Sequence, residues 1–506
     1  MDRTLLEKKS VAELREIAST LGLRGHQRRK KAELVDLIIE TGTQDSGAEP
    51  SGPAGSSEAT TPAEATTPAE ATTPAEATTT SEGNGRADRD EPRDERGQAR
   101  RDRGRDEQGR GDRDRGRGKP RDQRGNDGQD GDDVEVRRGV LDLLPEGYGF
   151  LRCTGYLAGS QDVYVSQSFV RRFDLRRGDL ISGPIRRNRN SDKFPALARV
   201  DSVEGESFDP REAKDRRPAF ADLTPSFPDE RFRLATGDAP VSMRLLDMIA
   251  PIGKGQRGLV VSPPKAGKTV MLKELAAAVE RADSDVELLL VLVDERPEEI
   301  TDLERASDGE VISSTFDRPP EDHTQVAELA VERAKRLVER GRDVVVLLDS
   351  LTRLTRAYNL VVAGSGRGLP GGIDAAALAP AKRLFGAARN IDGGGSLTII
   401  ATAAIETGAP MDDAIFEEFR GTGNMELRLD GRMERRRLFP AVDVAASGTL
   451  REDLLLPQDE LEAIWELRRQ LAGQELEDGL EVLLERLAAT DSNEAFLDEV
   501  RRSGLA

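Results

Sequence analysis

The stretch Gly258-Leu-Val-Val-Ser-Pro-Pro-Lys-Ala-Gly-Lys-Thr269 decides the fold of the largest region, because it reads as a strand running into a phosphate-binding loop. Such a loop directs backbone N–H groups and a helix N-terminus at phosphates. Lys268 is placed to reach the β- and γ-phosphates, and the Thr269 hydroxyl to bind Mg²⁺. Ser262 stands where the general pattern has its first glycine. The alternative is an ordinary strand-to-helix turn, but apolar residues at helical spacing follow the loop and favour a nucleoside triphosphate site.

Two further strand ends carry carboxylates. The run Val344–Leu348 ends in Asp349, which is placed to hold Mg²⁺ through water opposite Thr269; a plain strand-end cap is the alternative. Glu295 follows another apolar run and is placed to orient and deprotonate an attacking water. Apolar runs alternate with helical patterns and predict an α/β domain whose parallel sheet is covered on both faces. The runs are 259–261, 288–293, 344–348 and 397–403.

Composition limits the other chemistries. The chain has 506 residues, 75 basic and 94 acidic, with a net charge of −19, so nucleic-acid binding requires local basic grooves. One cysteine, Cys153, and two histidines, His26 and His323, exclude a disulfide framework and argue against a Cys/His zinc site. The first residues lack an apolar signal core and no apolar run approaches the length of a membrane span. We therefore expect a soluble, cytoplasmic protein without a membrane partner.

The N-terminal third divides into two parts. Residues 1–42 predict a small helical module with a basic loop, which suits either a nucleic-acid contact or a solvated face. Residues 43–133 contain three Ala-Thr-Thr-Pro-Ala-Glu units and a segment of Arg, Asp, Glu, Gly and Gln, which predicts a disordered low-complexity insert. A solubilising linker is slightly favoured there over an auxiliary RNA-binding arm.

Residues 134–204 contain five short β-rich runs and predict a small barrel of the OB type. Aromatic residues lie near cations in this region, an arrangement that holds single-stranded nucleic acid by base stacking and phosphate pairing. Each aromatic residue alone is more often a core residue, but the string Gly147-Tyr-Gly-Phe-Leu-Arg152 favours binding of single-stranded nucleic acid. The candidates are Tyr148, Phe150, Tyr164 and Phe194, with Arg152 beside them.

Residues 205–240 predict a proline-rich connector to an ATPase domain at 241–506, which ends in helices over 458–502. Two loops in this domain suit contact with a polymer. One is Gly364–Gly372, which is rich in glycine and carries Arg367, and the other is Gly408–Asp412, which follows a strand. Loops at the carboxyl edge of a sheet can couple nucleotide state to a ligand in a pore, and a plain surface connection is the alternative.

Several long strings resemble the family of bacterial transcription termination factor Rho. They are Ser262–Thr269, Asp294-Glu-Arg-Pro-Glu-Glu299, Leu348-Asp-Ser-Leu-Thr-Arg-Leu354, Arg356-Ala-Tyr-Asn359, Phe385-Gly-Ala-Ala-Arg-Asn390, Ser396-Leu-Thr-Ile-Ile-Ala-Thr402 and Phe416-Glu-Glu-Phe-Arg-Gly-Thr-Gly-Asn-Met-Glu-Leu427. The resemblance covers residues 1–42 and 134–506. It implies a homohexameric ring with a RecA-like motor that hydrolyses ATP, translocates along cytosine-rich single-stranded RNA and terminates transcription, with RNA polymerase and elongation factors as further partners.

The resemblance also assigns residues. It implies a primary RNA site at Tyr148, Phe150, Arg152, Asp162, Tyr164 and Phe194, and a secondary site at Arg367, Gly408 and Pro410. It implies a nucleotide-binding segment of Pro264, Lys265, Ala266, Gly267, Lys268, Thr269 and Val270. Glu295 maps to the catalytic glutamate, Asp349 to the magnesium-binding aspartate, and Arg437 to an arginine that senses nucleotide across a subunit interface.

The chain departs from the family pattern at two positions. The family's arginine finger lies in Ser-Gly-Thr-Arg, whereas this chain has Ser447-Gly-Thr-Leu450-Arg451, so Arg451 or Arg437 must supply the charge. Pro410 replaces a basic residue of the second channel loop, which leaves channel contacts to Arg367 and backbone groups.

Three functions therefore compete. The first is an RNA-dependent ATPase and helicase. The second is mainly an RNA-binding ring protein with weak ATP turnover, and the third is a RecA-like motor on DNA. Stimulation of ATP hydrolysis by cytosine-rich RNA separates the first from the other two.

Overall fold

A computed structural model describes residues 135–186, 193–207, 217–362, 364 and 366–503. All of these belong to one compact unit of the chain, residues 122–506. The predicted helical module at 1–42 and the predicted insert at 43–133 lie outside the described residues. Among the residues that are described, no helix is both long and apolar enough to cross a membrane.

The first part of the chain that the structure describes is a closed five-stranded barrel, as the sequence predicts. Its strands pair in the order β1-β2-β3-β5-β4, and β1 also pairs with β4, which closes the barrel. Side chains alternate along β2 and β3, so that Leu151, Val163 and Val165 enter the barrel core. The last of the five β-rich runs in the sequence, residues 196–203, forms two short strands, β5 and β6. The elements are β1 (Val136–Leu143), β2 (Gly149–Arg152), β3 (Val163–Val165), α4 (Gln167–Arg172), β4 (Leu180–Arg186), β5 (Ala196–Leu197), β6 (Ser202–Val203) and β7 (Glu206–Ser207).

The motor part is built on a sheet with strand order β11-β10-β12-β14-β9-β15-β16. Every neighbouring pair is parallel except β15 and β16, which confirms the predicted parallel sheet. The strands are β9 (Arg257–Ser262), β10 (Glu287–Glu295), β11 (Glu310–Thr315), β12 (Asp343–Asp349), β14 (Ser396–Ala404), β15 (Met425–Arg428) and β16 (Gly448–Thr449). The segment predicted as a connector also contributes, because β8 (Pro225–Ser226) pairs with β13 (Arg389–Ile391).

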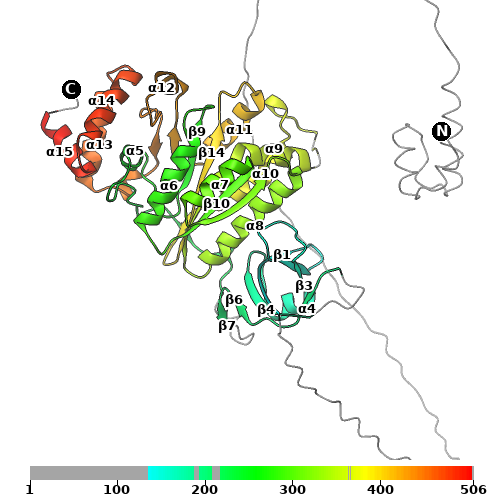
Figure 1. Ribbon diagram of the computed structural model, residues 1–506. Helices are drawn as coiled ribbons and strands as arrows, with labels where there is room; N and C mark the ends of the chain where they lie inside the picture. The colour runs from blue at the N-terminus through cyan, green and yellow to red at the C-terminus, as the bar shows by residue number, and fades with distance from the viewer. Residues whose placement is uncertain (1–134, 187–192, 208–216, 363, 365, 504–506) are drawn as a thin grey trace, which may run out of the picture. The chain divides into compact units, whose positions relative to one another are not determined.

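Helices cover both faces of this sheet (Figure 1). Alternate residues of β10 enter two different cores, Leu289 and Val291 on one face and Leu288 and Leu290 on the other. The first face packs against α8 (Pro320–Val338), α9 (Leu351–Val361), α10 (Ala375–Phe385) and α11 (Pro410–Arg420). The second packs against α5 (Val241–Ile249), α6 (Lys268–Ala282), α13 (Gln458–Leu471), α14 (Leu476–Ala488) and α15 (Asn493–Ser503). The remaining elements are α7 (Pro297–Ala306), α12 (Gly431–Arg436) and the short 3-10 turns η2 (Phe220–Asp222), η3 (Pro370–Gly372) and η4 (Glu452–Leu454).

Candidate active site and nucleic-acid interface

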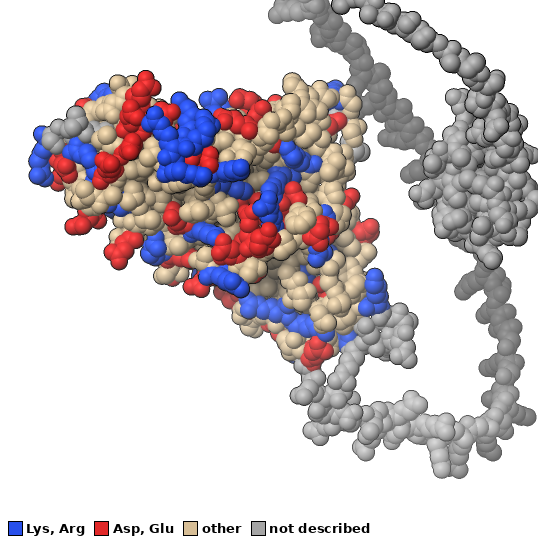
Figure 2. All heavy atoms as spheres, turned by 45° about the horizontal axis from the view of Figure 1, so that its top comes forward, with Lys and Arg blue, Asp and Glu red and all other residues tan. Residues whose placement is uncertain are grey.

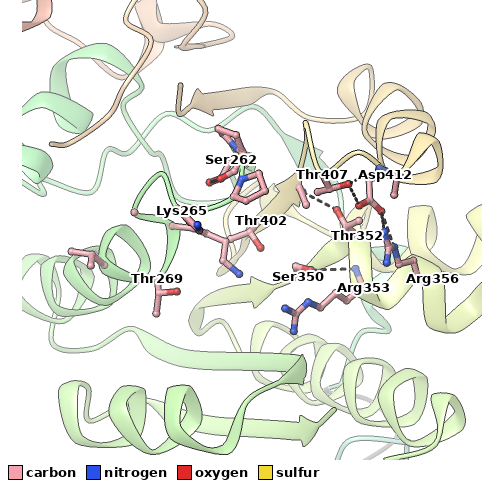
Figure 3. A pocket seen from close by; sticks show the side chains of 17 residues that line it. Ser262, Lys265, Thr269, Ser350, Thr352, Arg353, Arg356, Thr402, Thr407 and Asp412 are labelled. Carbon is pink, nitrogen blue, oxygen red and sulfur yellow. Dashed lines mark hydrogen bonds and ion pairs between the residues drawn. The ribbon is translucent and has the colours of Figure 1, made fainter. Parts of the chain in front are cut away.

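The phosphate-binding loop joins β9 to α6 at the carboxyl edge of the sheet. Gly267 precedes the helix with a φ of 96°, a left-handed conformation that a side chain would strain, and Lys265 also has a positive φ of 67°. Ser262 ends β9 in strand conformation, so this position does not need the glycine of the general pattern. The loop lines a cavity of about 660 Å³ into which the N-terminus of α6 opens (Figure 3). This geometry suits phosphate binding.

The two predicted carboxylates and the lysine of the loop meet in this region. Neighbouring strands β10 and β12 end in Glu295 and Asp349, each only 2 % exposed. Lys268 Nζ lies 3.3 Å from Glu295 Oε1 and donates to Asp349 Oδ1 at 2.6 Å. The three residues that the sequence assigned to separate catalytic roles therefore form one cluster.

The charges of this cluster influence each other. Burial, together with the charge of Asp349, raises the pKa of Glu295, although Lys268 and Arg353 act in the opposite direction. Burial alone would lower the pKa of Lys268, but Asp349 and Glu295 outweigh it and raise that pKa. The lysine therefore stays charged, and Glu295 has a greater proton affinity than an exposed glutamate.

Sequence reasoning gave no role to two side chains that hold this cluster. Arg353, in the first turn of α9, places Nη1 3.2 Å from Glu295 Oε1 and also donates to the backbone carbonyl of Asp294. The Thr402 hydroxyl, from β14, donates to Asp349 Oδ1 at 2.7 Å. Both residues lie in strings that resemble the family, Leu348–Leu354 and Ser396–Thr402, but the contact of Thr402 with Asp349 follows only from the order of the strands.

The oxygen donors present suit Mg²⁺, a hard cation that prefers carboxylates, hydroxyls, phosphates and water. Asp349 supplies a buried carboxylate, and Thr269 supplies a hydroxyl that donates only a long hydrogen bond, 3.4 Å, to Glu299 Oε2. No group of three or more His, Cys, Asp or Glu side chains that could hold a metal occurs among the described residues.

A second, more apolar hollow of about 460 Å³ adjoins the phosphate-binding loop. It is lined by Gly267, Val270 and Met271 of the loop and helix α6, and by Phe439 from beyond α12. Val270 is 57 % and Phe439 48 % exposed, which is unusual for large apolar side chains without a ligand or partner. The hollow suits the base of a nucleotide, and the sequence analysis had not identified Phe439.

The two loops predicted to contact a polymer, 364–372 and 408–412, lie against each other. A Cβ added to Gly371 would stand 2.6 Å from the carbonyl oxygen of Pro410, so only glycine permits this approach. Pro410 itself begins α11, a position that favours proline, and Gly408 has a φ of 79°. Arg367 is exposed in the first loop.

The second loop also borders the nucleotide cavity. Asp412 Oδ1 accepts from Arg356 Nε at 2.7 Å, and its Oδ2 accepts from the Thr407 hydroxyl at 2.6 Å (Figure 3). All three side chains line the same cavity as Lys268. A ligand that contacts this loop would therefore be linked to the cavity of the phosphate-binding loop through the ion pair between Arg356 and Asp412.

In the barrel, the four candidate aromatic residues form a surface cluster and stay outside the core. Each is half-buried and none belongs to the barrel core, which decides against the core alternative. Phe150 and Tyr164 face each other across β2 and β3, with ring centroids 5.9 Å apart. Tyr148 lies 5.6 Å from Tyr164, and Phe194 lies 5.3 Å from Phe150. Lys193 Nζ lies 5.3 Å from the centre of the Phe194 ring.

Arg152 and Asp162 lie beside this cluster but are almost buried. Arg152 is 8 % exposed, and its guanidinium stands 5.7 Å from the centre of the Phe150 ring. Its Nη1 donates to Asp162 Oδ2 at 2.6 Å. The other oxygen of this carboxylate, Asp162 Oδ1, is buried and has no hydrogen-bond partner among the described residues. A buried acceptor without a donor lowers the stability of the folded state, so a ligand that donates a hydrogen bond to this oxygen would remove that cost.

The arginines predicted to act across a subunit interface are placed as follows. Arg437 ends α12 with a φ of 62° and is highly exposed, and the arginines of α12 contribute to a basic surface region (Figure 2). Leu450 is 64 % exposed. Arg451 is paired with Asp453, with Nε 3.0 Å from Oδ1, and its guanidinium lies 5.4 Å from the centre of the Phe227 ring. Neither Leu450 nor Arg451 lines the nucleotide cavity of its own chain.

Comparison with known proteins supports the same organisation. Family models match three segments: the Rho termination factor N-terminal domain at residues 5–47, the Rho termination factor RNA-binding domain at 137–209, and the ATP synthase alpha/beta family nucleotide-binding domain at 242–449. Transcription termination factor Rho of Chromobacterium violaceum is 52 % identical over 369 residues, which cover 72 % of this chain and 88 % of that protein. The protein of the same name from Pseudomonas aeruginosa is 51 % identical, with 72 % and 87 % covered.

Other relatives are longer. Transcription termination factor Rho of Micrococcus luteus is 54 % identical over 378 residues, 72 % of this chain but 54 % of that protein, so this chain spans about half the length of some curated relatives that it matches. A solved structure described as a prototypical ATPase from a bacterial type III secretion system aligns with 63 % of this chain and 94 % of its own, at a TM-score of 0.47 and 20 % identity.

Proposed function

We propose, from the fact that this chain belongs to the transcription termination factor Rho family, that it hydrolyses ATP when it binds single-stranded RNA and uses that energy to terminate transcription. The observation that carries this proposal is the meeting of Lys268, Glu295 and Asp349 at one sheet edge, beside a phosphate-binding loop. The half-buried aromatic cluster of the barrel supplies the second requirement, a surface on which bases stack.

For hydrolysis, each residue of the cluster has a distinct task. Lys268 contacts two carboxylates in the free protein, and its charged ammonium group pairs with the β- and γ-phosphates when nucleotide enters. Thr269 and Asp349 would hold Mg²⁺, which neutralises charge that develops on the phosphates. Glu295, with its raised pKa, orients the attacking water and accepts its proton. Phe439 and Val270 cover the base in the adjoining hollow.

For RNA, the barrel favours cytosine. An aspartate accepts a hydrogen bond from the exocyclic amino group of cytosine, which a uracil lacks. Asp162 Oδ1 is a buried acceptor without a hydrogen-bond partner among the described residues, and Arg152 beside it would offer donors to the acceptors of the same base edge. The base itself stacks on the cluster of Phe150 and Tyr164.

The assembly we propose is a homohexameric ring in the cytoplasm. Arg367, Gly408 and Pro410 would then line a channel that holds RNA, because their loops contact each other near the nucleotide cavity. Leu450 and Arg451 lie outside their own chain's cavity, as expected for a segment that serves the nucleotide of a neighbouring subunit. RNA polymerase and elongation factors would be further partners.

The test is ATP hydrolysis in the presence of polycytidylic acid, polyuridylic acid and single-stranded polydeoxycytidylic acid. We expect the first to stimulate most. Replacing Phe150 and Tyr164 by alanine should weaken RNA affinity by about 1–3 kcal/mol per lost stack. Val136→Ala, another exposed apolar side chain of the barrel, serves as the control. Equal stimulation by DNA would favour the DNA motor, and unchanged affinity in the folded double variant would reject the aromatic site.

A second function is favoured by one observation. Leu450 is an exposed apolar residue where the family has its arginine finger, and Arg451 is already paired with Asp453. A ring that binds RNA and nucleotide but turns ATP over weakly would have this arrangement. Strong RNA-dependent turnover of the unmodified chain would reject it.

A further inference from the structure

One buried carboxylate in the barrel is shared between the RNA site and the motor. Asp142, in β1, is 3 % exposed. Its Oδ2 accepts from Arg152 Nη2 at 2.6 Å and from Arg152 Nε at 3.2 Å. The same oxygen accepts from Gln325 Nε2 at 2.9 Å, and Oδ1 accepts from Arg177 Nε at 3.0 Å. Asp142 is therefore the main support of the arginine that we place against the base.

Two of the groups that hold Asp142 depend on helix α8 of the motor, which lies beside β1 (Figure 1). Gln325 is itself on α8. Arg177, from the barrel, donates through Nη1 to Glu328 Oε2 at 3.1 Å, one turn further along the same helix. Glu328 Oε1 in turn accepts from the Tyr358 hydroxyl of α9 at 3.0 Å. Burial, together with the charge of Glu328, raises the pKa of Tyr358, so this hydroxyl remains a donor.

The backbones of the two parts are also in close contact at this place. Gly178 follows Arg177 and has a φ of 91°. A Cβ added there would stand 2.5 Å from the carbonyl carbon of Glu332 in α8, which leaves no room for a side chain. The position of Arg177 relative to α8 is therefore fixed by packing as well as by its ion pair.

Burial makes these contacts effective. A buried carboxylate attracts its donors more strongly than an exposed one, and loss of a hydrogen bond to a buried charged group is costly. Arg152 directs three N–H groups at the two carboxylates of Asp142 and Asp162. If Asp142 turns, the guanidinium turns with it, and so do the N–H groups that we propose Arg152 offers to a base.

We propose that Gln325 and Glu328, two residues of the motor, are positioning residues of the RNA site in the barrel. Gln325 acts directly on Asp142 and Glu328 acts through Arg177; together they hold Arg152 in the orientation that distinguishes cytosine from uracil. This inference rests on the proposed RNA-binding function of the barrel. It means that the motor helix α8 sets base specificity without contacting RNA.

The experiment uses the full chain without nucleotide. Dissociation constants for an oligocytidylate and an oligouridylate of equal length are measured for Gln325→Ala, Glu328→Gln and the control Glu321→Gln. Glu321 is an exposed residue of the same helix, and its replacement changes the net charge by the same amount as Glu328→Gln. We expect the first two variants to weaken oligocytidylate binding by about threefold to tenfold, with a smaller loss for oligouridylate.

The design separates positioning from charge. Glu328→Gln removes a negative charge, which by itself would strengthen binding to RNA, so a weaker oligocytidylate complex must have another cause. Glu321→Gln measures the size of this charge effect. The positioning role is wrong if Gln325→Ala and Glu328→Gln fold but weaken oligocytidylate and oligouridylate binding by the same factor. It is also wrong if they weaken neither.

The variant Arg152→Ala distinguishes failure of the positioning role from failure of the proposed RNA site. If it abolishes the preference for cytosine while Gln325→Ala and Glu328→Gln retain it, the RNA site stands and this inference fails. If Arg152→Ala leaves both dissociation constants unchanged, the proposed RNA site itself is wrong. Binding of a fluorescent ATP analogue, unchanged in all variants, verifies that the motor is folded.

Discussion

The nucleotide cavity and the Leu450–Arg451 segment differ in how complete they are within one chain. In the cavity, Glu295 and Asp349 are buried, Lys268 is half-buried, and the lysine lies within hydrogen-bond or ion-pair distance of both carboxylates. In the other segment, the exposed Leu450 occupies the position of the family's arginine finger, and Arg451, the next residue, is ion-paired with Asp453. The first region is organised before ligand binds, whereas the second requires a rearrangement.

This difference indicates where catalysis is limited. Preorganised charges act on a transition state without reorganisation, which is why a fixed cluster is effective. In the ring that we propose, Arg451 would have to leave Asp453 and the Phe227 ring to reach the nucleotide of a neighbouring subunit. We therefore expect ATP binding to be determined by the cavity and the rate of turnover by the Leu450–Arg451 segment.

The largest effect is expected in the cavity. Lys268→Ala removes the cation between Glu295 and Asp349 and should lower ATP hydrolysis by about 10²–10³-fold, while RNA binding by the barrel stays nearly intact. Steady-state hydrolysis and RNA affinity are measured on the same preparation. Lys273→Ala, which removes a half-buried lysine of the same helix α6 that does not line the cavity, is the control. Equal loss of hydrolysis and RNA binding in a folded variant would contradict the separation of the two sites.

The sequence predicted the cavity well because its parts follow from local rules. A strand, a glycine-containing loop and a helix bring Lys268 to the sheet edge, and the carboxyl ends of parallel strands bring Glu295 and Asp349 there too. Thr402 and Phe439 could not be predicted in this way. Their places depend on strand order and on the path of the chain after α12, which no local pattern encodes.

The barrel shows a second limit. Alternation along β2 and β3 indicates which aromatic residues leave the core, so Phe150 and Tyr164 were identifiable. The burial of Arg152 was not, because its partners Asp142 and Asp162 are each ten residues away and meet it only through strand pairing. The contact of Gln325 with Asp142 joins residues 183 positions apart, and no periodicity predicts it.

The second largest effect is expected for the finger substitute. An arginine finger is worth about 10³–10⁵ in rate, and a substitute one residue out of register should retain part of this. We therefore expect Arg451→Ala to lower turnover by roughly 10²-fold, with nucleotide binding and assembly unchanged, and Arg437→Ala to lower it less. Asp453→Asn is the matched variant, because it releases Arg451 from its ion pair and should raise turnover.

Two outcomes would change this interpretation. Parent-level hydrolysis by Arg451→Ala would show that Arg451 is not the substitute. A decrease in turnover for Asp453→Asn, with nucleotide affinity unchanged, would show that the ion pair itself is the active arrangement.

A smaller effect is expected from restoring the family residue. Leu450 is 64 % exposed, so Leu450→Arg should fold without repacking a core. If Arg451 already supplies part of the positive charge at the γ-phosphate, the gain in turnover should be about tenfold, less than the full rate contribution of an arginine finger. Leu454→Arg, a nearby exposed leucine, controls for added positive charge. A gain of three orders of magnitude would instead show that the parent chain is mainly an RNA-binding protein.

The smallest effect is expected in the pH dependence of the cavity. Burial and the charge of Asp349 raise the pKa of Glu295 above its ordinary value of about 4.3. A general base acts only when deprotonated, so hydrolysis should fall as pH decreases through this raised pKa. The acid limb of kcat/KM reports ionisations of the free protein, and we expect it above the range of an exposed glutamate.

Two variants should move this acid limb in opposite directions. The cation of Arg353 favours the charged form of Glu295, so Arg353→Gln should shift the limb to higher pH. The carboxylate of Glu299 disfavours that form, so Glu299→Gln should shift it to lower pH. Because the two substitutions produce the same neutral side chain type, opposite shifts can arise only from the sign of the charge removed. Shifts in the same direction, or a limb within the ordinary range of glutamate, would show that another group limits hydrolysis and that the cavity is less preorganised than its contacts indicate.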